Sequence, residues 1–193
     1  MQFHVENYLA RLHATMDALP TDRMTELAET LLRAYQNDKQ VFTVGNGGSS
    51  STASHMAADL AKNTIGPNMR RFRITSLNDN ASIMTALAND LGYDHVFSEQ
   101  LINVIRAGDV LIAVSASGNS PNIINAIRCA QRHSAHVVGL LGFDGGLAAE
   151  LVDNAIVVSS RDYGVVEDMH LIINHMLVEY FREHLAETRA WMV

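Results

Sequence analysis

Apolar residues at the start of the chain recur at helical spacing. Five of them lie three or four positions apart: Val5, Leu9, Leu12, Met16 and Leu19. This spacing predicts an amphipathic helix with a narrow apolar stripe. Pro20 ends the pattern, and a second helix is expected from about 21 to 35. The two helices either pack on the rest of the domain or form a bundle with other subunits, and the regular stripe favours the bundle.

From residue 40 onward, short apolar runs alternate with helical patterns. The expected strands are 40–45, 71–76, 109–115, 135–142 and 154–160. The expected helices are 50–63, 79–89, 94–106, 119–133, 146–151 and 165–188, and the last is apolar nearly all round. Such alternation predicts a parallel sheet with helices on both faces. Ligands of open parallel sheets bind beyond the carboxyl ends of the strands.

The composition limits the classes of function. A chain of 193 residues with 48% hydrophobic and 18% charged residues suits one globular domain, here 1–193. The net charge of −7 argues against a nucleic-acid-binding surface. The single cysteine, Cys129, fits a reducing compartment, and no apolar run has the length of a membrane span. We therefore expect a cytoplasmic protein that binds neither nucleic acid nor membrane.

The loop after the first expected strand has the properties of an anion site. The sequence GNGGSS follows the apolar run 40–45 and leads into a helical pattern. Glycines allow a ligand to approach the backbone, and the N–H groups at a helix start attract negative charge. The loop has neither the G-x-G-x-x-G fingerprint nor the lysine of a Walker loop.

A second loop of this kind, SASGNS, follows the strand expected at 109–115 and precedes Pro121. One interpretation is that Ser49 and Ser120 merely cap helices. Two hydroxyl-rich loops at the carboxyl ends of two strands favour a phosphate site instead. Because neither loop contains a lysine, we expect a phosphate monoester that is held and not transferred.

Residues suited to metal binding or acid–base chemistry lie on two helices. His55 and Asp59 are four positions apart and therefore share a helix face. Alone, such a pair is more often a surface contact than half of a metal site. The last helix, otherwise apolar, carries four more groups of this type: Glu167, Asp168, His170 and His175. Charged groups in that setting need partners or a role.

The chain resembles the sugar isomerase (SIS) domain, and more closely the bacterial phosphoheptose isomerases. The motifs that carry the resemblance are GNGGSS, H-x-x-x-D, ANDLGYDHVFS, SASGNS, GFDGG and EDMHLIINH, spread over almost the whole chain. These enzymes interconvert sedoheptulose 7-phosphate and D-glycero-D-manno-heptose 7-phosphate. The resemblance implies an α/β three-layer sandwich with a five-stranded parallel flavodoxin-like sheet and an N-terminal helix pair. It also implies a homotetramer with active sites at subunit interfaces, in which the helices within 1–38 contribute to oligomer packing.

The resemblance also assigns roles to individual residues. The positions that bind substrate or its phosphate are Asn46, Gly47, Ser49, Asp90, Ser115, Ser117 and Ser120. The positions that bind zinc are His55, Asp59, Glu167 and His175, with Asp168 as a competitor for Glu167 on helix geometry. Asp59 and His175 fall on the acid–base positions, and the implied chemistry is aldose–ketose isomerisation through an enediol.

The chain departs from the family pattern near these positions. The family has glutamate at 59 and glutamine at 167, and an arginine where this chain has Asn63. An aspartate and an arginine at the start of the last helix are replaced by Gly164 and Val165. Two functions are therefore weighed: an isomerase, and a non-catalytic phosphosugar-binding tetramer of the type that binds the replication initiator. The presence of both acid–base positions favours the isomerase.

Overall fold

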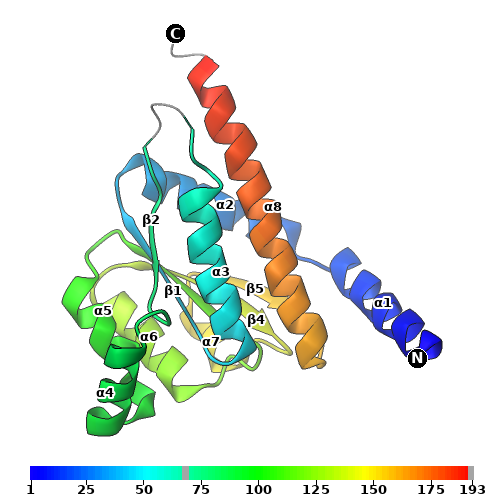
Figure 1. Ribbon diagram of the computed structural model, residues 1–193, viewed down its shortest axis with the longest axis horizontal. Coiled ribbons are helices and arrows are strands. Elements are labelled where there is room, and N and C mark those ends of the chain that lie inside the picture. The colour runs from blue at the N-terminus through cyan, green and yellow to red at the C-terminus, as the bar shows by residue number, and fades with distance from the viewer. Residues whose placement is uncertain (67–69, 191–193) are drawn as a thin grey trace.

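The computed structural model describes residues 1–66 and 70–190, the last five of these by their backbone alone (Figure 1). Five strands in this part form one parallel sheet in the order β2-β1-β3-β4-β5. They are β1 (Gln40–Gly45), β2 (Arg73–Ser76), β3 (Val110–Ser115), β4 (His136–Gly142) and β5 (Asn154–Val158). This is the strand order of flavodoxin-like sheets, so the expected fold class is confirmed.

Helices flank the sheet, and most of them begin close to where the apolar pattern predicts. They are α1 (Gln2–Asp17), α2 (Thr21–Gln36), α3 (Gly48–Lys62), α4 (Ala81–Leu91), α5 (Ser98–Val104), α6 (Pro121–Arg132), α7 (Gly146–Leu151) and α8 (Tyr163–Ala190). The helix expected at 94–106 is wrong in extent, because a 3₁₀ turn η1 (Tyr93–His95) precedes the shorter α5. Val96 and Phe97 between them are fully buried, so the chain turns there to insert both side chains into the core.

Two apolar cores lie on opposite faces of the sheet. Alternate strand residues supply them, because successive side chains of a strand point to opposite faces. Ile112 belongs to the core under α1, α2, α3 and α8, whereas Leu111 and Ala113 belong to the core under α4, α5, α6 and α7. Burial on both faces explains why the strands read as continuous apolar runs.

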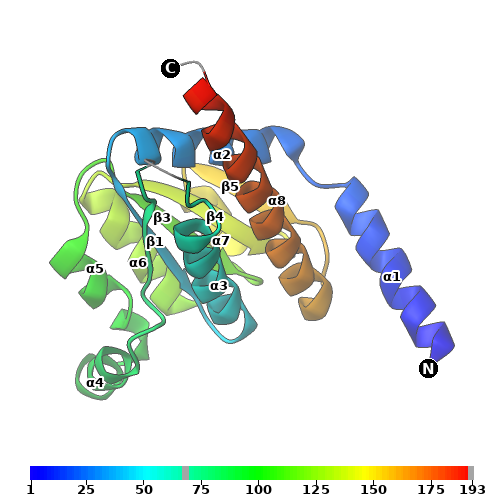
Figure 2. The ribbon, with the colours of Figure 1, turned by 45° about the horizontal axis from the view of Figure 1, so that its top comes forward.

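The N-terminal helices differ in how they meet the domain. On α2, Leu27 and Leu31 are fully buried in the core that lies under α3 and α8. In contrast, α1 extends away from the body of the molecule (Figures 1 and 2). Its Leu12 packs against that core, whereas Val5 and Leu9 of the same predicted stripe are exposed. The helix pair is therefore divided between the domain's own core and an open apolar surface.

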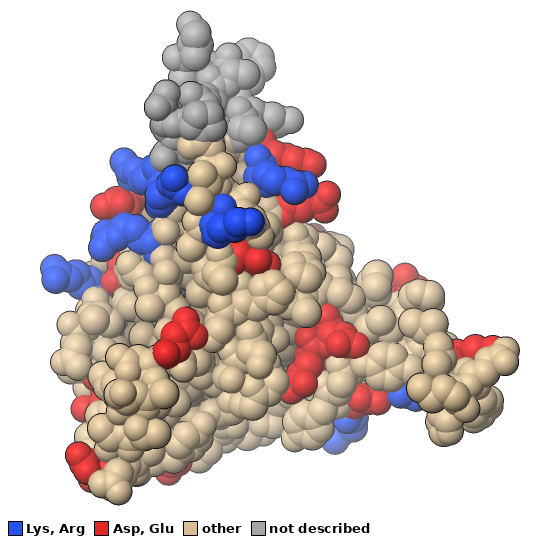
Figure 3. Space-filling model, in the orientation of Figure 1, with Lys and Arg blue, Asp and Glu red and all other residues tan. Residues whose placement is uncertain are grey.

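Helices α3 and α8 lie side by side on one face of the sheet and run in the same direction (Figures 1 and 2). Both begin at the carboxyl edge of the strands, where the two hydroxyl-rich loops also lie. On the face shown in Figure 3, most Lys and Arg side chains gather at the far end of this helix pair. Among the described residues, no helix is long and apolar enough to cross a membrane.

The core under α6 offers a direct test of this packing. Ile127 is fully buried, so Ile127→Ala should lower the free energy of unfolding by about 2–5 kcal/mol, since it removes buried methyl groups and leaves a cavity. Ile102 on α5 is 49% exposed and serves as the matched control, with a much smaller expected loss. Urea unfolding followed by circular dichroism measures both changes, and equal losses would contradict the assignment of Ile127 to the core.

Candidate active site

The first hydroxyl-rich loop joins β1 directly to α3. Gly47 has a φ of +54°, a left-handed conformation that favours glycine, and α3 begins at the next residue. The amide of Asn46 forms a reciprocal pair of hydrogen bonds with the amide of Asn122 on α6, each 2.9 Å long. The hydroxyl of Tyr93 also donates to the Oδ1 atom of Asn46, at 2.9 Å. These bonds fix the loop relative to α6 and η1.

A small pocket of about 140 Å³ lies where the two loops meet. Most of the predicted phosphate-binding residues line it together with four others: Asn46, Ser49, Ser115, Ser117 and Ser120 are the predicted ones, and Val114, Ala116, Tyr163 and Glu167 are the others. Gly47 lies in the loop beside this pocket. Asp90 does not line it: this residue is exposed on α4. The structure thus brings together in one chain the serines that the sequence places on two separate loops.

The side chains of Ser49 and Ser120 do not make the capping hydrogen bonds that the alternative interpretation requires. In the described structure, Gly47 is the N-cap residue of α3 and Ser120 is the N-cap residue of α6, and neither cap has a side-chain hydrogen bond. The Ser117 hydroxyl accepts a hydrogen bond from the Asn119 N–H at 3.3 Å, and Ser115 accepts one from Gly118 at 3.1 Å. The second loop itself thereby orients the hydroxyls of Ser115 and Ser117.

Three helices start at this pocket, because Ser49, Ser120 and Tyr163 mark the beginnings of α3, α6 and α8. The positive ends of their dipoles favour an anion, and the lining contains no lysine or arginine among the described residues. The carboxylate of Glu167 lies directly against Gly48, where a Cβ atom would collide with it. The absence of a side chain at position 48 therefore lets α8 place a carboxylate at the start of α3.

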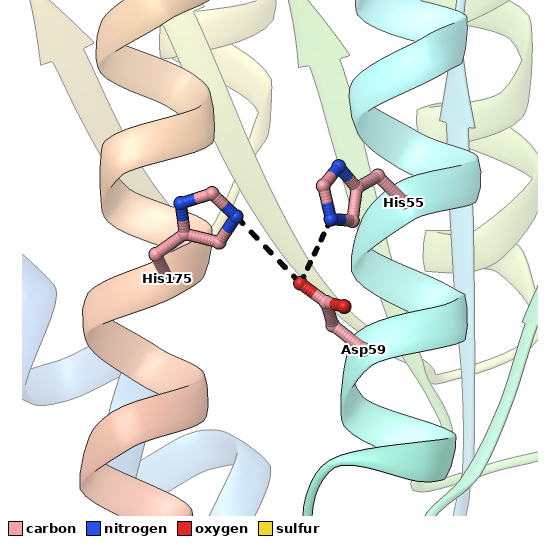
Figure 4. A group of neighbouring side chains, drawn as sticks. All are labelled: His55, Asp59 and His175. Carbon is pink, nitrogen blue, oxygen red and sulfur yellow. Dashed lines mark ion pairs between the residues drawn. The ribbon is translucent and has the colours of Figure 1, made fainter.

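A second group of polar side chains lies farther along the same two helices (Figure 4). His55 and Asp59 come from α3 and His175 from α8, and one ligand atom of each lies within 4.8 Å of the others. The Asp59 Oδ2 atom lies 3.1 Å from Nε2 of His55 and 3.8 Å from Nε2 of His175. The ring centroids of the two histidines are 5.3 Å apart. Two imidazoles and a carboxylate at these distances form a possible metal-binding group.

Asp59 is the most buried member of this group, and both of its oxygens accept further hydrogen bonds. Its side chain is 15% exposed, against 43% for His55 and 55% for His175. The Asn63 side-chain amide donates to Oδ1 at 2.9 Å, and the Asn174 amide donates to Oδ2 at 3.0 Å. The carboxylate is thus held from its own helix and from α8.

The acidic residues at the start of α8 lie outside this close group. Glu167 lies at the serine pocket, as described above. Asp168 accepts a hydrogen bond from the Tyr8 hydroxyl at 2.6 Å, which joins α8 to α1. This hydrogen bond raises the pKa of Tyr8 to about 12. Asp168 is therefore engaged with the N-terminal helix.

His170, the other histidine of α8, is fully buried and has a different environment. Its Nε2 atom lies 3.1 Å from the carbonyl oxygen of Leu141, to which it donates in the neutral form. Burial lowers the pKa of His170 to about 4, because the charged imidazolium loses its hydration. This histidine therefore stays neutral at neutral pH and links α8 to the end of β4.

Comparison with known proteins agrees with this geometry. The family model described as SIS domain matches residues 5–142. The chain belongs to the SIS domain family. Phosphoheptose isomerases from Pelobacter propionicus and Sulfurimonas denitrificans are each 36% identical to this SIS-domain chain, over 84% and 85% of it and 85% and 84% of their own lengths. These relatives place it in the phosphoheptose isomerase group of the family.

A solved structure gives the same assignment for the fold of this SIS domain. The phosphoheptose isomerase from Neisseria gonorrhoeae superimposes with a TM-score of 0.87 at 30% sequence identity. The match covers 94% of this chain and 98% of that chain. The similarity therefore extends over nearly the whole SIS domain.

Sequence reasoning missed several residues that shape the site of this SIS domain. Tyr163 lines the pocket, and Tyr93 and Asn122 hold Asn46 in place. Asn174 contacts Asp59 from a fully buried position. Its only signal in the sequence is a polar residue among the apolar residues of the last helix, directly before His175.

The buried His170 predicts an acid-sensitive fold. Between pH 6.5 and about 4 the unfolded chain binds a proton at this histidine and the folded chain does not. The stability due to neutral His170 is therefore complete above pH 6.5 and is lost as the pH falls toward 4, by about 3 kcal/mol in total. Urea unfolding at a series of pH values measures the loss.

The matched variants are His170→Gln, whose side chain does not titrate, and His13→Gln at an exposed histidine of α1. Loss of stability on acidification should be smaller in His170→Gln than in the unsubstituted chain, and unchanged in His13→Gln. An identical pH dependence in all three proteins would contradict the assignment.

Proposed function

We propose that this chain is an aldose–ketose isomerase of sugar phosphates that converts sedoheptulose 7-phosphate to D-glycero-D-manno-heptose 7-phosphate. Its relatives support a sugar-phosphate isomerase at the coarser level. The observation that carries the finer proposal is the arrangement on α3 and α8: the serine pocket lies at their start, and the group of His55, Asp59 and His175 lies farther along both helices.

The separation of these two places favours a long sugar chain. From Ser49 to His55 there are six residues, which span about 9 Å along a helix axis. A seven-carbon chain extended at about 1.2 Å per bond covers such a span together with its phosphate ester, whereas a three-carbon chain is much shorter. A phosphate held by Ser49, Ser115, Ser117 and Ser120 would thus present the carbonyl end of a heptose to the histidine and aspartate side chains.

The residues present also fit a zinc ion. Two imidazole nitrogens and one carboxylate oxygen are a common catalytic ligand set for this metal. Bound zinc would polarise the carbonyl oxygen of the sugar. Glu167 stays our proposal for a fourth ligand, and in that role its carboxylate has to leave Gly48.

The proposed reaction moves one proton between neighbouring carbons. The Asp59 carboxylate removes the proton from the carbon beside the carbonyl, and the electron pair forms the carbon–carbon double bond of an enediol. His175 donates a proton to the carbonyl oxygen in the same step. Protonated Asp59 then returns a proton to the former carbonyl carbon, and the hydroxyl proton on the other carbon passes to His175, which gives the isomer and restores both side chains.

The remaining proposals concern the assembly and its surroundings. We propose a homotetramer with active sites at subunit interfaces, supported by the exposed Phe3, Val5 and Leu9 on α1. In that assembly the exposed Asp90 on α4 would contact sugar in another subunit's site. Buried Cys129 supports a cytoplasmic location.

The alternative to catalysis is a non-catalytic tetramer that binds phosphosugars and acts as an adaptor.

The decisive test is turnover of sedoheptulose 7-phosphate in deuterated water, with zinc and after chelation. We expect aldose formation with incorporation of solvent deuterium, and loss of turnover after chelation. Asp59→Asn should lower kcat by about 10²–10⁴-fold because the base is removed. Asp22→Asn, at an exposed position of α2, is the control and should keep full activity. No turnover, with sugar phosphate still raising the melting temperature, would favour the adaptor.

The phosphate pocket gives an independent prediction. Ser120→Ala removes a hydroxyl that lines the pocket but caps no helix, so it should leave stability unchanged. A hydrogen bond to a charged group contributes about 1.5–3 kcal/mol, so KM and the Kd of inorganic phosphate should rise about tenfold or more, with kcat unchanged. Ser51→Ala, at an exposed position of α3, should alter neither constant. Unchanged phosphate affinity in Ser120→Ala would contradict the proposal that this pocket binds the phosphate.

A further inference from the structure

Asn174 is a buried polar side chain that the proposed reaction does not use. It is fully buried on α8, and its Nδ2 atom donates to Oδ2 of Asp59 at 3.0 Å. Its Oδ1 atom is buried and has no hydrogen-bond partner among the described residues. A buried amide with one unsatisfied atom costs stability, and an apolar side chain would suit this helix better. The contact with Asp59 is therefore the feature that needs this amide.

The bond lies at the oxygen that faces the two histidines. Oδ2 of Asp59 is 3.1 Å from His55 and 3.8 Å from His175, whereas Oδ1 accepts from the amide of Asn63. Each oxygen thus receives one neutral N–H donor, which fixes the plane of the carboxylate and leaves its negative charge in place. The remaining lone pair on Oδ2 then faces the histidine side, shown in Figure 4.

Asn174 and His175 approach this carboxylate from different sides. Adjacent residues of a helix point about a quarter-turn or more apart, and here the first is fully buried and the second is 55% exposed. Asn174 therefore contacts Asp59 from the core, and His175 contacts it from the solvent side. Helix α8 thus supplies both the amide of Asn174, which supports Asp59, and the imidazole of His175, which lies beside Asp59.

We propose that Asn174 is a positioning residue that orients Oδ2 of Asp59 toward the histidines, for metal binding and for proton removal. This inference rests on the proposed function, because it deepens the role of the same site. Partners that hydrogen-bond to metal-binding carboxylates typically change metal affinity or activity by 10–100-fold when they are removed. A purely structural amide would change only the stability.

The chain offers a matched control for that distinction. Asn154 on β5 is also fully buried, its Nδ2 atom donates to the Arg23 carbonyl at 2.9 Å, and its Oδ1 atom likewise has no partner among the described residues. Asn154→Leu and Asn174→Leu therefore remove equivalent amides. Both should lower the melting temperature, but only the second removes a bond to Asp59.

The experiment measures zinc affinity by competition with a chelator, the visible absorption spectrum of the Co²⁺-loaded protein, and kcat and KM. Asn174→Leu should weaken zinc binding about 10–100-fold, change the Co²⁺ spectrum, and lower kcat more than it changes KM. Asn154→Leu should keep the metal affinity, the spectrum and kcat of the unsubstituted chain. Asn174→Asp, which keeps the shape of the amide but lacks its N–H donor, provides a second variant.

The outcomes separate this inference from the proposed function. Unchanged zinc affinity and Co²⁺ spectrum in both position-174 variants would overturn the positioning role while turnover by the unsubstituted chain still stands. If the unsubstituted chain binds metal but does not turn over, the proposed reaction fails, and the metal measurements alone decide the role of Asn174. If the unsubstituted chain binds neither Zn²⁺ nor Co²⁺, the metal site and the positioning role both fail.

Discussion

The packing of α8 against α3 is the contact on which the site depends. Gly48 has no side chain, so the carboxylate of Glu167 lies against the first turn of α3. Farther along the same pair of helices, Asn174 donates to Asp59. The hydrogen bond between Asn174 and Asp59 constrains how α8 lies along α3, because a shift of one helix along the other would break it. The distance between the serine pocket and the group around Asp59 is therefore set by the backbone of the helix pair.

Much of the architecture follows from the periodicity of the chain, because the strands of a parallel sheet are buried on both faces and read as apolar runs. The stretch around Val96 and Phe97 shows where that reasoning ends. A helix over 94–106 satisfies the local pattern, but full burial of both side chains requires a turn before α5. The apolar stripe of the N-terminal helix also could not be assigned a partner from its spacing, since Leu12 packs against the domain's core and Leu9 is exposed. Periodicity identifies an apolar face but not its partner.

The site was predictable where it is local in sequence. The four-residue spacing of His55 and Asp59 places them on one helix face, and the serines follow two strands that end at the same edge. That His175 completes the group within one chain depends on the packing of α8, which spacing alone does not determine. The contact between Asn174 and Asp59 was not predictable from the sequence. A polar residue in an apolar helix is a visible signal, but its partner lies more than a hundred residues away along the chain.

Under the proposed function, the two amides explain how a short carboxylate would serve at a position where the resemblance implies a longer one. Asp59 reaches about one bond less far than a glutamate, and a misplacement of about 1 Å costs ~10²-fold in rate. Here the carboxylate stays close to both helices, and the histidines lie around it at 3.1 and 3.8 Å. The donors Asn63 and Asn174 are neutral, so they hold the carboxylate without forming an ion pair with it. In the proposed reaction, fixed orientation thus replaces reach as the means of placing Asp59.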